Sequence, residues 1–296
     1  MARVELPQRG LHLEYESHGD AARPAVILIM GLGLQLVSWP RAMLDALVDA
    51  GYRAIVFDNR DIGLSGTGTL PTYTPAPRAL LAHLLHQPFT PPYRIADMAT
   101  DTLALADALR IERFAVLGVS LGGMVAQTLA AREPARVWSL ISIMSSAGPR
   151  TAPWPQIPLL WRFLQPPPKG SDFAARLEHF VRLMQALGNI DDERELATLR
   201  ARLTLSLQRA YRPAGAARQL LAVLADPDRS AEVATIRCPT LIIHGADDPL
   251  VPVQAARHLA KLLPRAQLAI LPRMGHYLPG AVLPEMMRLC AAHLRG

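Results

Sequence analysis

A five-residue stretch places one serine where it could serve as a nucleophile. Gly118-Val119-Ser120-Leu121-Gly122 forms a G-x-S-x-G pattern, which follows an apolar, strand-like run at 114–119 and opens a helical pattern at 120–132. A serine on so tight a strand-to-helix turn takes a strained conformation that exposes its hydroxyl, and flanking glycines allow close chain approach. The pattern favours Ser120 as the nucleophile of an acyl-transfer reaction. The alternative is a glycine-rich turn that only packs the helix on the strand.

A serine hydroxyl is a weak nucleophile, so a general base must lie within its reach. His276 sits in Met274-Gly275-His276-Tyr277, a short loop after an expected strand at 267–271. Loops at the carboxyl ends of parallel strands gather along one edge of the sheet, where ligands bind. We therefore expect His276 to meet Ser120 and to act as the base. His244 ends another expected strand, at 240–244, and we expect a hydrogen-bonded structural role for it.

The imidazole in turn needs a carboxylate that fixes its tautomer and stabilises the imidazolium. Two neighbouring candidates, Asp247 and Asp248, follow the expected strand at 240–244. Either of them could serve, because both lie in the loop at the carboxyl end of that strand. The order along the chain is then nucleophile, acid and base.

Ester hydrolysis also needs hydrogen-bond donors for the oxyanion of the tetrahedral intermediate. The backbone N–H of Leu121, directly after the nucleophile, is one expected donor. The second is expected from the loop after the strand at 26–30, where the two glycines Gly31 and Gly33 let the backbone approach a ligand. We predict the Leu32 N–H as this donor. These glycines could alternatively form no more than a turn.

The elements that must position these residues alternate along the chain. Helical patterns occupy 38–50, 95–109, 120–132, 252–262 and 283–293. Alternation at 11–16 predicts an edge strand with one solvent-exposed face. Strands that alternate with helices predict an α/β fold with a mostly parallel central sheet and helices on both faces. Continuous apolar runs predict buried strands at 26–30, 53–57, 114–119, 137–144, 240–244 and 267–271.

The segment 148–231 interrupts this alternation. It is rich in proline at its start, has helical patterns at 173–187 and 192–207, and contains no buried-strand pattern. We expect a helical cap over the pocket, inserted into a core formed by 1–147 and 232–296. Its apolar residues and scattered arginines favour uncharged esters of modest size. Substrate contacts are expected from residues beside the oxyanion loop and in the cap: Gly31, Gly33, Gln35, Trp39, Trp154 and Trp161.

Composition excludes several classes of protein. Half of the 296 residues are hydrophobic and 19% are charged, which is typical of a folded domain and not of a disordered chain. The net charge is +6, but the arginines are scattered among acidic residues. Without a block of like charges, the chain is not expected to bind nucleic acid. Two cysteines, Cys238 and Cys290, are too few for a disulfide scaffold.

The sequence also bears on location and cofactors. The first ten residues are charged and do not resemble a signal peptide. The longest apolar run, 24–37, is shorter than the roughly 20 residues of a membrane span. We therefore expect a cytoplasmic protein with a small-molecule substrate and no membrane partner. The lack of a dinucleotide fingerprint, a P-loop or a metal-spaced cluster predicts neither a cofactor nor a metal. No pattern sets the oligomeric state.

Five motifs together resemble the α/β-hydrolase superfamily, specifically its cap-bearing bacterial serine esterases. They are the oxyanion loop at 30–33, the segment 57–65, the Ser120 turn, the loop after 244 and the loop at 275–276. Such relatives carry a G-x-x-D-x-x-x-P pattern, which here selects Asp248 ahead of Pro252. The first loop reads Met-Gly where many relatives have His-Gly. The charges of 57–65 are expected to hold loops together, and the first two motifs are also similar to aclacinomycin methylesterases.

The resemblance implies an α/β-hydrolase fold and a serine carboxylesterase that works through an acyl-enzyme, with Ser120, His276 and Asp248 as its triad. A serine at the turn distinguishes the chain from haloalkane dehalogenases and epoxide hydrolases, which place aspartate there, and from dienelactone hydrolases, which place cysteine. One alternative is a specialised hydrolase with the same site: a lactonase, a polyketide-type methylesterase or a carbon–carbon bond hydrolase. A more remote alternative is a non-catalytic ligand receptor.

Overall fold

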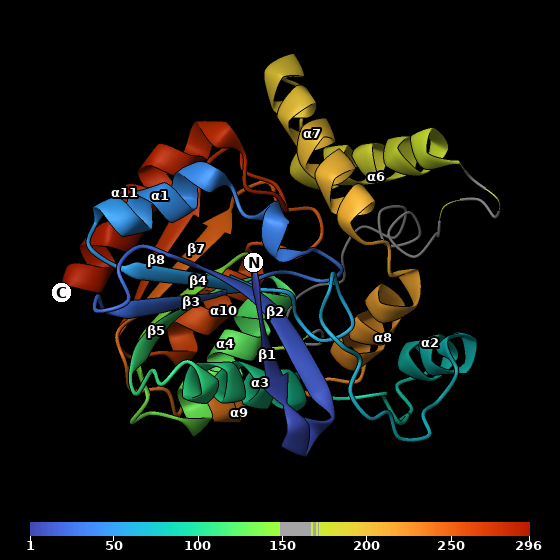
Figure 1. Cartoon of the computed structure of the whole chain (residues 1–296), viewed down its shortest axis with the longest axis horizontal. Coiled ribbons are helices and arrows are strands. Elements are labelled where there is room, and N and C mark those ends of the chain that lie inside the picture. The colour runs from blue at the N-terminus through green and yellow to red at the C-terminus, as the bar shows by residue number, and fades with distance from the viewer. Residues whose placement is uncertain (149–166, 168–169, 171) are drawn as a thin grey trace.

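The computed structural model describes residues 1–148, 167, 170 and 172–296. Trp154 and Trp161, which were expected to contact the substrate, lie outside the described residues. The described part contains a central sheet with helices on both faces (Figure 1). The α/β fold predicted from the sequence, with a mostly parallel central sheet and helices on both faces, is therefore confirmed.

The central sheet has eight strands in the order β1-β2-β4-β3-β5-β6-β7-β8. β2 pairs antiparallel with both β1 and β4, and every other neighbouring pair is parallel. The strands are β1 (Ala2–Leu6), β2 (Leu11–His18), β3 (Ala25–Ile29), β4 (Arg53–Phe57), β5 (Phe114–Val119), β6 (Val137–Ile143), β7 (Thr240–Gly245) and β8 (Ala266–Leu271).

The predicted edge position of the strand at 11–16 is wrong. β1 pairs with β2 along its whole length, from Ala2 opposite Tyr15 to Leu6 opposite Leu11, and is itself the edge strand. β1 alternates apolar and charged residues as a half-exposed strand does, so its signal was present in the sequence. β2 therefore has hydrogen-bonded neighbours on both sides.

Two groups of helices cover the two faces of the sheet (Figure 1). One face is covered by α1 (Arg41–Asp49) and α11 (Leu283–Arg295), and the other by α3 (Ile95–Ala108), α4 (Leu121–Arg132), α9 (Ser230–Val233) and α10 (Gln254–Leu262). Short 3-10 turns occur at η1 (Pro7–Arg9), η2 (Leu36–Ser38) and η3 (Gly280–Val282). The predicted helix at 38–50 begins only at Arg41, because Pro40 interrupts it.

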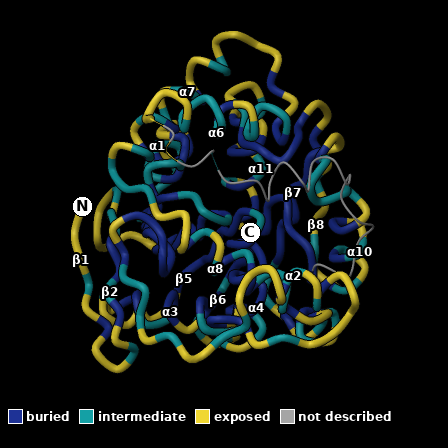
Figure 2. Tube along the Cα trace, turned by 90° about the vertical axis from the view of Figure 1, so that its right-hand side faces the viewer, coloured by how far each residue is buried: buried dark blue, intermediate teal, exposed yellow. Residues whose placement is uncertain are grey.

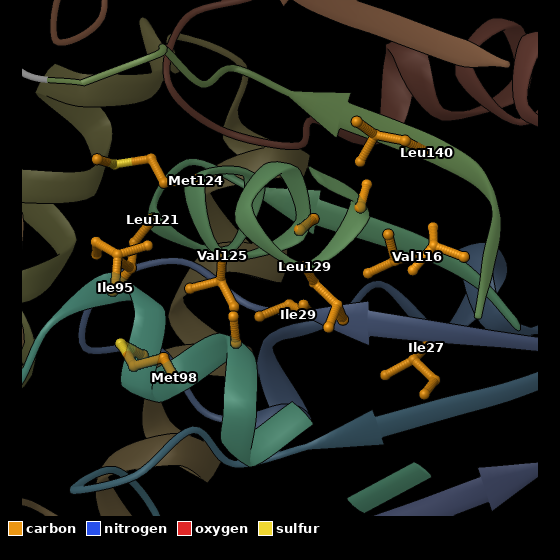
Figure 3. Packing of buried hydrophobic residues seen from close by; sticks show 14 of the residues in the cluster. Ile27, Ile29, Ile95, Met98, Val116, Leu121, Met124, Val125, Leu129 and Leu140 are labelled. Atoms are coloured by element: carbon orange, nitrogen blue, oxygen red, sulfur yellow. The ribbon is translucent and has the colours of Figure 1, made fainter. Parts of the chain in front are cut away.

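α4 is the helix that fixes Ser120, and it is almost entirely buried. Leu121, Val125 and Leu129 recur every four residues and pack between the sheet and α3 (Figure 3). Burial of such a side chain contributes about 1.5–3 kcal/mol. The strands β5, β6 and β7 run through the buried interior (Figure 2). The turn that joins β5 to α4 is thus held by rigid elements on both sides.

Four described helices lie in the sequence between β6 and β7, and we call the first three of them the inserted helices: α6 (Phe173–Gly188), α7 (Glu193–Arg209) and α8 (Pro213–Leu224). The first two match the predicted helices, and Asp172 and Asp192 cap their first turns through hydrogen bonds of 2.8 Å. α8 packs on α2 (Ala76–Leu84), which the sequence analysis did not predict. The division into a core and a cap at 148–231 remains a prediction. α6 and α7 share a small apolar core with the loop after β8: Val181, Ile190, Leu199, Leu203 and Tyr277.

Residues 1–148, 167, 170 and 172–296 contain no helix that is long and apolar enough to cross a membrane. In the same residues, no group of three or more histidine, cysteine, aspartate or glutamate side chains is arranged to hold a metal ion. Cys238 and Cys290 are both free thiols.

Candidate active site

Ser120 lies on a strained turn between β5 and α4. Its φ and ψ angles are 55° and −118°, a conformation that L-residues rarely adopt and that costs on the order of 1–3 kcal/mol. Gly118 and Gly122 make the turn sterically possible. A Cβ on Gly118 would lie 2.1 Å from the Gly122 carbonyl oxygen, and a Cβ on Gly122 would lie 2.0 Å from the Ile29 carbonyl oxygen. The glycine pattern is therefore a steric requirement of this turn.

His276 connects Ser120 to an acid through two hydrogen bonds. Its Nε2 is 2.9 Å from Ser120 Oγ, and its Nδ1 is 2.7 Å from Asp248 Oδ2. An ionised carboxylate only accepts hydrogen bonds, so Nδ1 carries the proton and Nε2 has a free lone pair. The Ser120 hydroxyl can then donate to Nε2, which is the arrangement that a general base needs.

The structure brings Asp248, and not Asp247, to His276. The Asp248 side chain is fully buried, and its second oxygen accepts the N–H groups of Leu250 at 2.9 Å and Val251 at 2.8 Å. Asp247 is exposed, and its backbone oxygen accepts a hydrogen bond from the side chain of Asn189, which follows α6 directly. Of the two candidate acids, Asp248 is thus the one within hydrogen-bond reach of His276.

His244 supports the loop that carries Asp248. Its Nε2 donates to the Val251 carbonyl oxygen at 2.8 Å, as expected of a hydrogen-bonded structural residue. Burial lowers the pKa of His244, and this effect outweighs the attraction of the Asp248 charge 3.6 Å away. His244 is therefore neutral near pH 7, so it does not form an ion pair with Asp248 in competition with His276.

The inserted helices also hold the His276 loop. The backbone N–H of His276 donates to the carbonyl oxygen of Leu187, near the end of α6, at 2.7 Å. Gly275 is pressed against the same place, since a Cβ on it would lie 2.6 Å from that oxygen. The position of the imidazole is thus set jointly by the loop after β8 and by α6.

The loop after β3 lies directly against Ser120. A Cβ on Gly31 would come within 3.5 Å of Ser120 Cβ. The Gly33 N–H is occupied, because it donates to Gln219 Oε1 of α8 at 2.9 Å, so the Leu32 N–H stays the candidate on this loop. Leu121 opens α4, where N–H groups have no acceptor within the helix. The arrangement is compatible with the two predicted oxyanion donors.

A cavity of about 330 Å³ opens beside Ser120 and His276. Its wall is mainly apolar and is completed by α6, α7 and α8. Of the residues expected to contact the substrate, Gly31, Gly33 and Gln35 border this cavity, whereas Trp39 does not. Trp39 packs instead into the core beneath α1, because the chain turns inward after η2. The expected substrate contact of Trp39 therefore has no support in the structure.

Gln35 has a further role, which the sequence analysis did not assign. Its Nε2 donates to the carbonyl oxygens of Ser206 and Ala210 at 2.7 Å each, and its Oε1 accepts from Arg209 at 2.8 Å. These bonds attach the end of α7 to the loop beside Ser120. Gln219 and Arg209 were also missed, and both lie outside the helical patterns recognised in the sequence.

The charges of 57–65 hold loops together, as the resemblance implied. Asp58 is fully buried and accepts the N–H groups of Leu36 and Leu64 and a bond from Arg209 at 2.6 Å. Burial raises the pKa of Asp58, while these donors act in the opposite direction. The neighbouring Asp61 forms a two-pronged ion pair with Arg218 of α8 at 2.7 and 2.9 Å.

Comparisons with known proteins agree with this fold. A family model described as the alpha/beta hydrolase fold matches residues 24–279. The putative carbamate hydrolase RutD of Variovorax paradoxus is 32% identical over 89% of both chains. Rhodomycin D methylesterase DauP of a Streptomyces strain is 30% identical over 95% of this chain and 94% of the relative. The enol-lactonase structure from Burkholderia xenovorans has the same fold, with a TM-score of 0.73 at 22% identity over 97% of this chain and 98% of its own.

Proposed function

This chain belongs to the α/β-hydrolase family, and on that premise we propose that it is a serine carboxylesterase. Its substrates would be small to medium carboxylic esters, hydrolysed through an acyl-enzyme. The observation that carries the proposal is the hydrogen-bonded series from Ser120 to His276 to Asp248 beside the cavity.

The first half of the reaction acylates the serine. Ser120 Oγ attacks the ester carbonyl while His276 Nε2 takes its proton, and Asp248 stabilises the imidazolium. The N–H groups of Leu121 and Leu32 bind the oxyanion, and each such donor contributes about 10²–10³ in rate. The intermediate then collapses, the carbon–oxygen bond to the alcohol breaks, and His276 returns the proton to the leaving alcohol.

The second half releases the acid. A water molecule attacks the acyl-Ser120 carbonyl and gives a proton to His276 Nε2, and the second tetrahedral intermediate is held by the same donors. Its collapse frees the carboxylic acid, and the proton returns to Ser120 Oγ. No cofactor or metal takes part in either half of this scheme.

The cavity supports the proposed size and polarity of the substrate. Its volume of about 330 Å³ is near the lower end of ligand pockets, which span about 300–1,000 Å³. The side chains around Ser120, among them Met30, Leu32 and Val119, are apolar, which fits an uncharged group around the scissile bond. We propose 148–231 as the cap that supplies much of this wall.

A second candidate is a specialised methylesterase that uses the same triad. The 30% identity to rhodomycin D methylesterase DauP over 95% of this chain favours it. A bulky methyl ester that turns over faster than simple esters would select this candidate. Both candidates share the acyl-enzyme chemistry and differ only in the substrate.

The proposal is tested by hydrolysis of p-nitrophenyl acetate and butyrate. We expect Ser120→Ala to lower kcat/KM by several orders of magnitude. Once a triad member is lost, only substrate binding and stabilisation of the oxyanion still accelerate the reaction. Ser17→Ala is the matched control, since Ser17 is an exposed serine on β2. Undiminished activity in the Ser120 variant would refute the proposed mechanism.

A further inference from the structure

The cavity beside Ser120 has cationic residues and no acidic residue in its described wall. Arg202 and Arg212 both border it, and no aspartate or glutamate does so within the described parts of the chain. Residues 149–166, 168–169 and 171 contain no acidic residue in their sequence either. The cationic residues of the described wall are therefore not balanced by a carboxylate within that wall.

Arg202 lies on the cavity face of α7. Leu199 and Ser206, three residues before it and four residues after it, border the same cavity. Residues at this spacing share one face of a helix. The guanidinium lies over the ring of Tyr277, 5.1 Å from its centroid, and Tyr277 follows His276 directly in the chain. The cation and the catalytic pair thus share one cavity.

The guanidinium of Arg202 is incompletely paired. Its Nε is buried and has no hydrogen-bond partner among the residues that the structure describes. Its Nη2 is 3.4 Å from Glu195 Oε1. A close charge-assisted hydrogen bond has a donor–acceptor distance of about 2.7–2.9 Å, so this contact is a long one. The Glu195 oxygens already accept the Tyr277 hydroxyl at 3.0 Å and the Gly280 N–H at 2.7 Å. Arg202 therefore keeps donor capacity that Glu195 does not use.

Neighbouring arginines of the inserted helices are used differently. Arg212 donates to the Ser65 carbonyl oxygen, Arg209 pairs with Asp58, and Arg218 pairs with Asp61. Each of these bonds ties an inserted helix to the loops of the core. Among the described residues Arg202 makes no hydrogen bond of this kind, and its contact with the core is stacking on the ring of Tyr277.

Burial of Arg202 also has a cost that an anion would offset. Burial lowers the pKa of Arg202, and the Glu195 charge compensates only in part. A guanidinium nevertheless stays protonated in proteins, so the partly buried Arg202 is a cation that has lost part of its solvation. Two carboxylate oxygens match the planar fork of a guanidinium and form the strongest class of side-chain hydrogen bonds.

We propose that Arg202 binds a free carboxylate of the substrate, remote from the ester that Ser120 attacks. The preferred substrates are then half-esters of dicarboxylic acids or similar esters that carry one acid group. This inference rests on the proposed esterase function and narrows its substrate class. It replaces the expectation of a wholly uncharged substrate, while the group around the scissile bond stays uncharged.

The test compares monomethyl adipate with methyl hexanoate, which has the same acyl chain length and no acid group. In Arg202→Gln we expect the ratio of the two kcat/KM values to fall about 10- to 100-fold, mostly through KM, because the contact is equally strong in the ground and transition states. Arg202→Lys should keep part of the ratio. Arg200→Gln is the matched control, since Arg200 lies on the same helix, pairs with Glu178 and does not border the cavity.

A ratio that is unchanged in Arg202→Gln, or a wild-type protein that favours methyl hexanoate, would overturn the inference. A second experiment measures the affinities of adipate and of hexanoate for the Ser120→Ala variant by calorimetry. It tests the carboxylate site separately from the proposed esterase function, because binding needs no turnover. Adipate binding that disappears when Arg202→Gln is added supports the carboxylate site even if no ester is hydrolysed. Equal binding of adipate and hexanoate refutes it even if Ser120-dependent hydrolysis is found.

Discussion

Gln219 joins an inserted helix to the loop that we propose as half of the oxyanion hole. Its side chain is completely buried; Oε1 accepts the Gly33 N–H at 2.9 Å, and Nε2 donates to the Arg60 carbonyl oxygen at 3.0 Å. α8 also packs against the loop, since a Cβ on Gly33 would lie 3.4 Å from Ala216 Cβ. The Gln219 side chain therefore ties the loop beside Ser120 to α8 and, through Arg60, to the segment 57–65.

Gln219→Leu keeps the approximate volume and removes both hydrogen bonds. It leaves the buried Arg60 carbonyl oxygen without a partner, at a cost of about 1–3 kcal/mol, and removes the acceptor of the part-buried Gly33 N–H, a loss of about 0.5–1.5 kcal/mol. We expect the free energy of unfolding to fall by about 1.5–4.5 kcal/mol. Because the loop loses its fixed position, we also expect kcat to fall about 10- to 100-fold, since a shift of about 1 Å in a catalytic group can cost 10²-fold.

The assay measures kcat and KM for p-nitrophenyl butyrate together with urea unfolding. Gln208→Leu is the control, because Gln208 is an exposed glutamine on α7. A loss in kcat at temperatures where Gln219→Leu is fully folded supports the positioning role. A folded Gln219→Leu variant with the wild-type kcat would refute the reasoning, whatever its stability.

Three further predictions concern the triad, the turn and pH. Asp248→Asn should lower kcat about 10⁴-fold because it favours the wrong tautomer of the base, whereas Asp247→Asn should change kcat less than threefold; equal losses would contradict the assignment. Gly122→Ala should prevent folding or abolish labelling of the nucleophile, because its Cβ would lie 2.0 Å from a backbone oxygen of β3; normal folding and activity would contradict the steric argument. Burial raises the pKa of Asp226 from 3.8 to about 6, so the stability from this group is full below about pH 3.8 and is lost as the pH rises through 6. Between pH 4 and 6, the free energy of unfolding of the wild type, measured with urea, should therefore fall by up to about 3 kcal/mol relative to that of Asp226→Asn. A difference between the two proteins that does not change with pH would contradict this.

That Ser120 and His276 lie together could be predicted because their signals are local. Ser120 lies in a glycine pattern that has a steric explanation, and His276 lies in a short loop at a strand end. Parallel strands bring such loops together whatever their separation in the sequence. The acid was less certain, because Asp247 and Asp248 are neighbours and only the turn of the loop decides which side chain faces inward.

Trp39 shows where nearness in sequence misleads. It follows the oxyanion loop closely, but η2 turns the chain so that the indole packs into the core and not into the cavity. Gln219 and Arg202 show the opposite case. Both lie far in sequence from the residues that they contact, and their roles depend on how the inserted helices pack, which a helical pattern does not specify.

The central claim is that Ser120 is a nucleophile activated by His276 and Asp248. It is tested most directly by reaction of the native protein with a fluorophosphonate, followed by intact and peptide mass spectrometry. The account predicts one adduct per chain, located on Ser120, together with slow labelling in His276→Ala and none in Ser120→Ala. An unlabelled native protein, or an adduct on another residue at the same rate in Ser120→Ala, would contradict it.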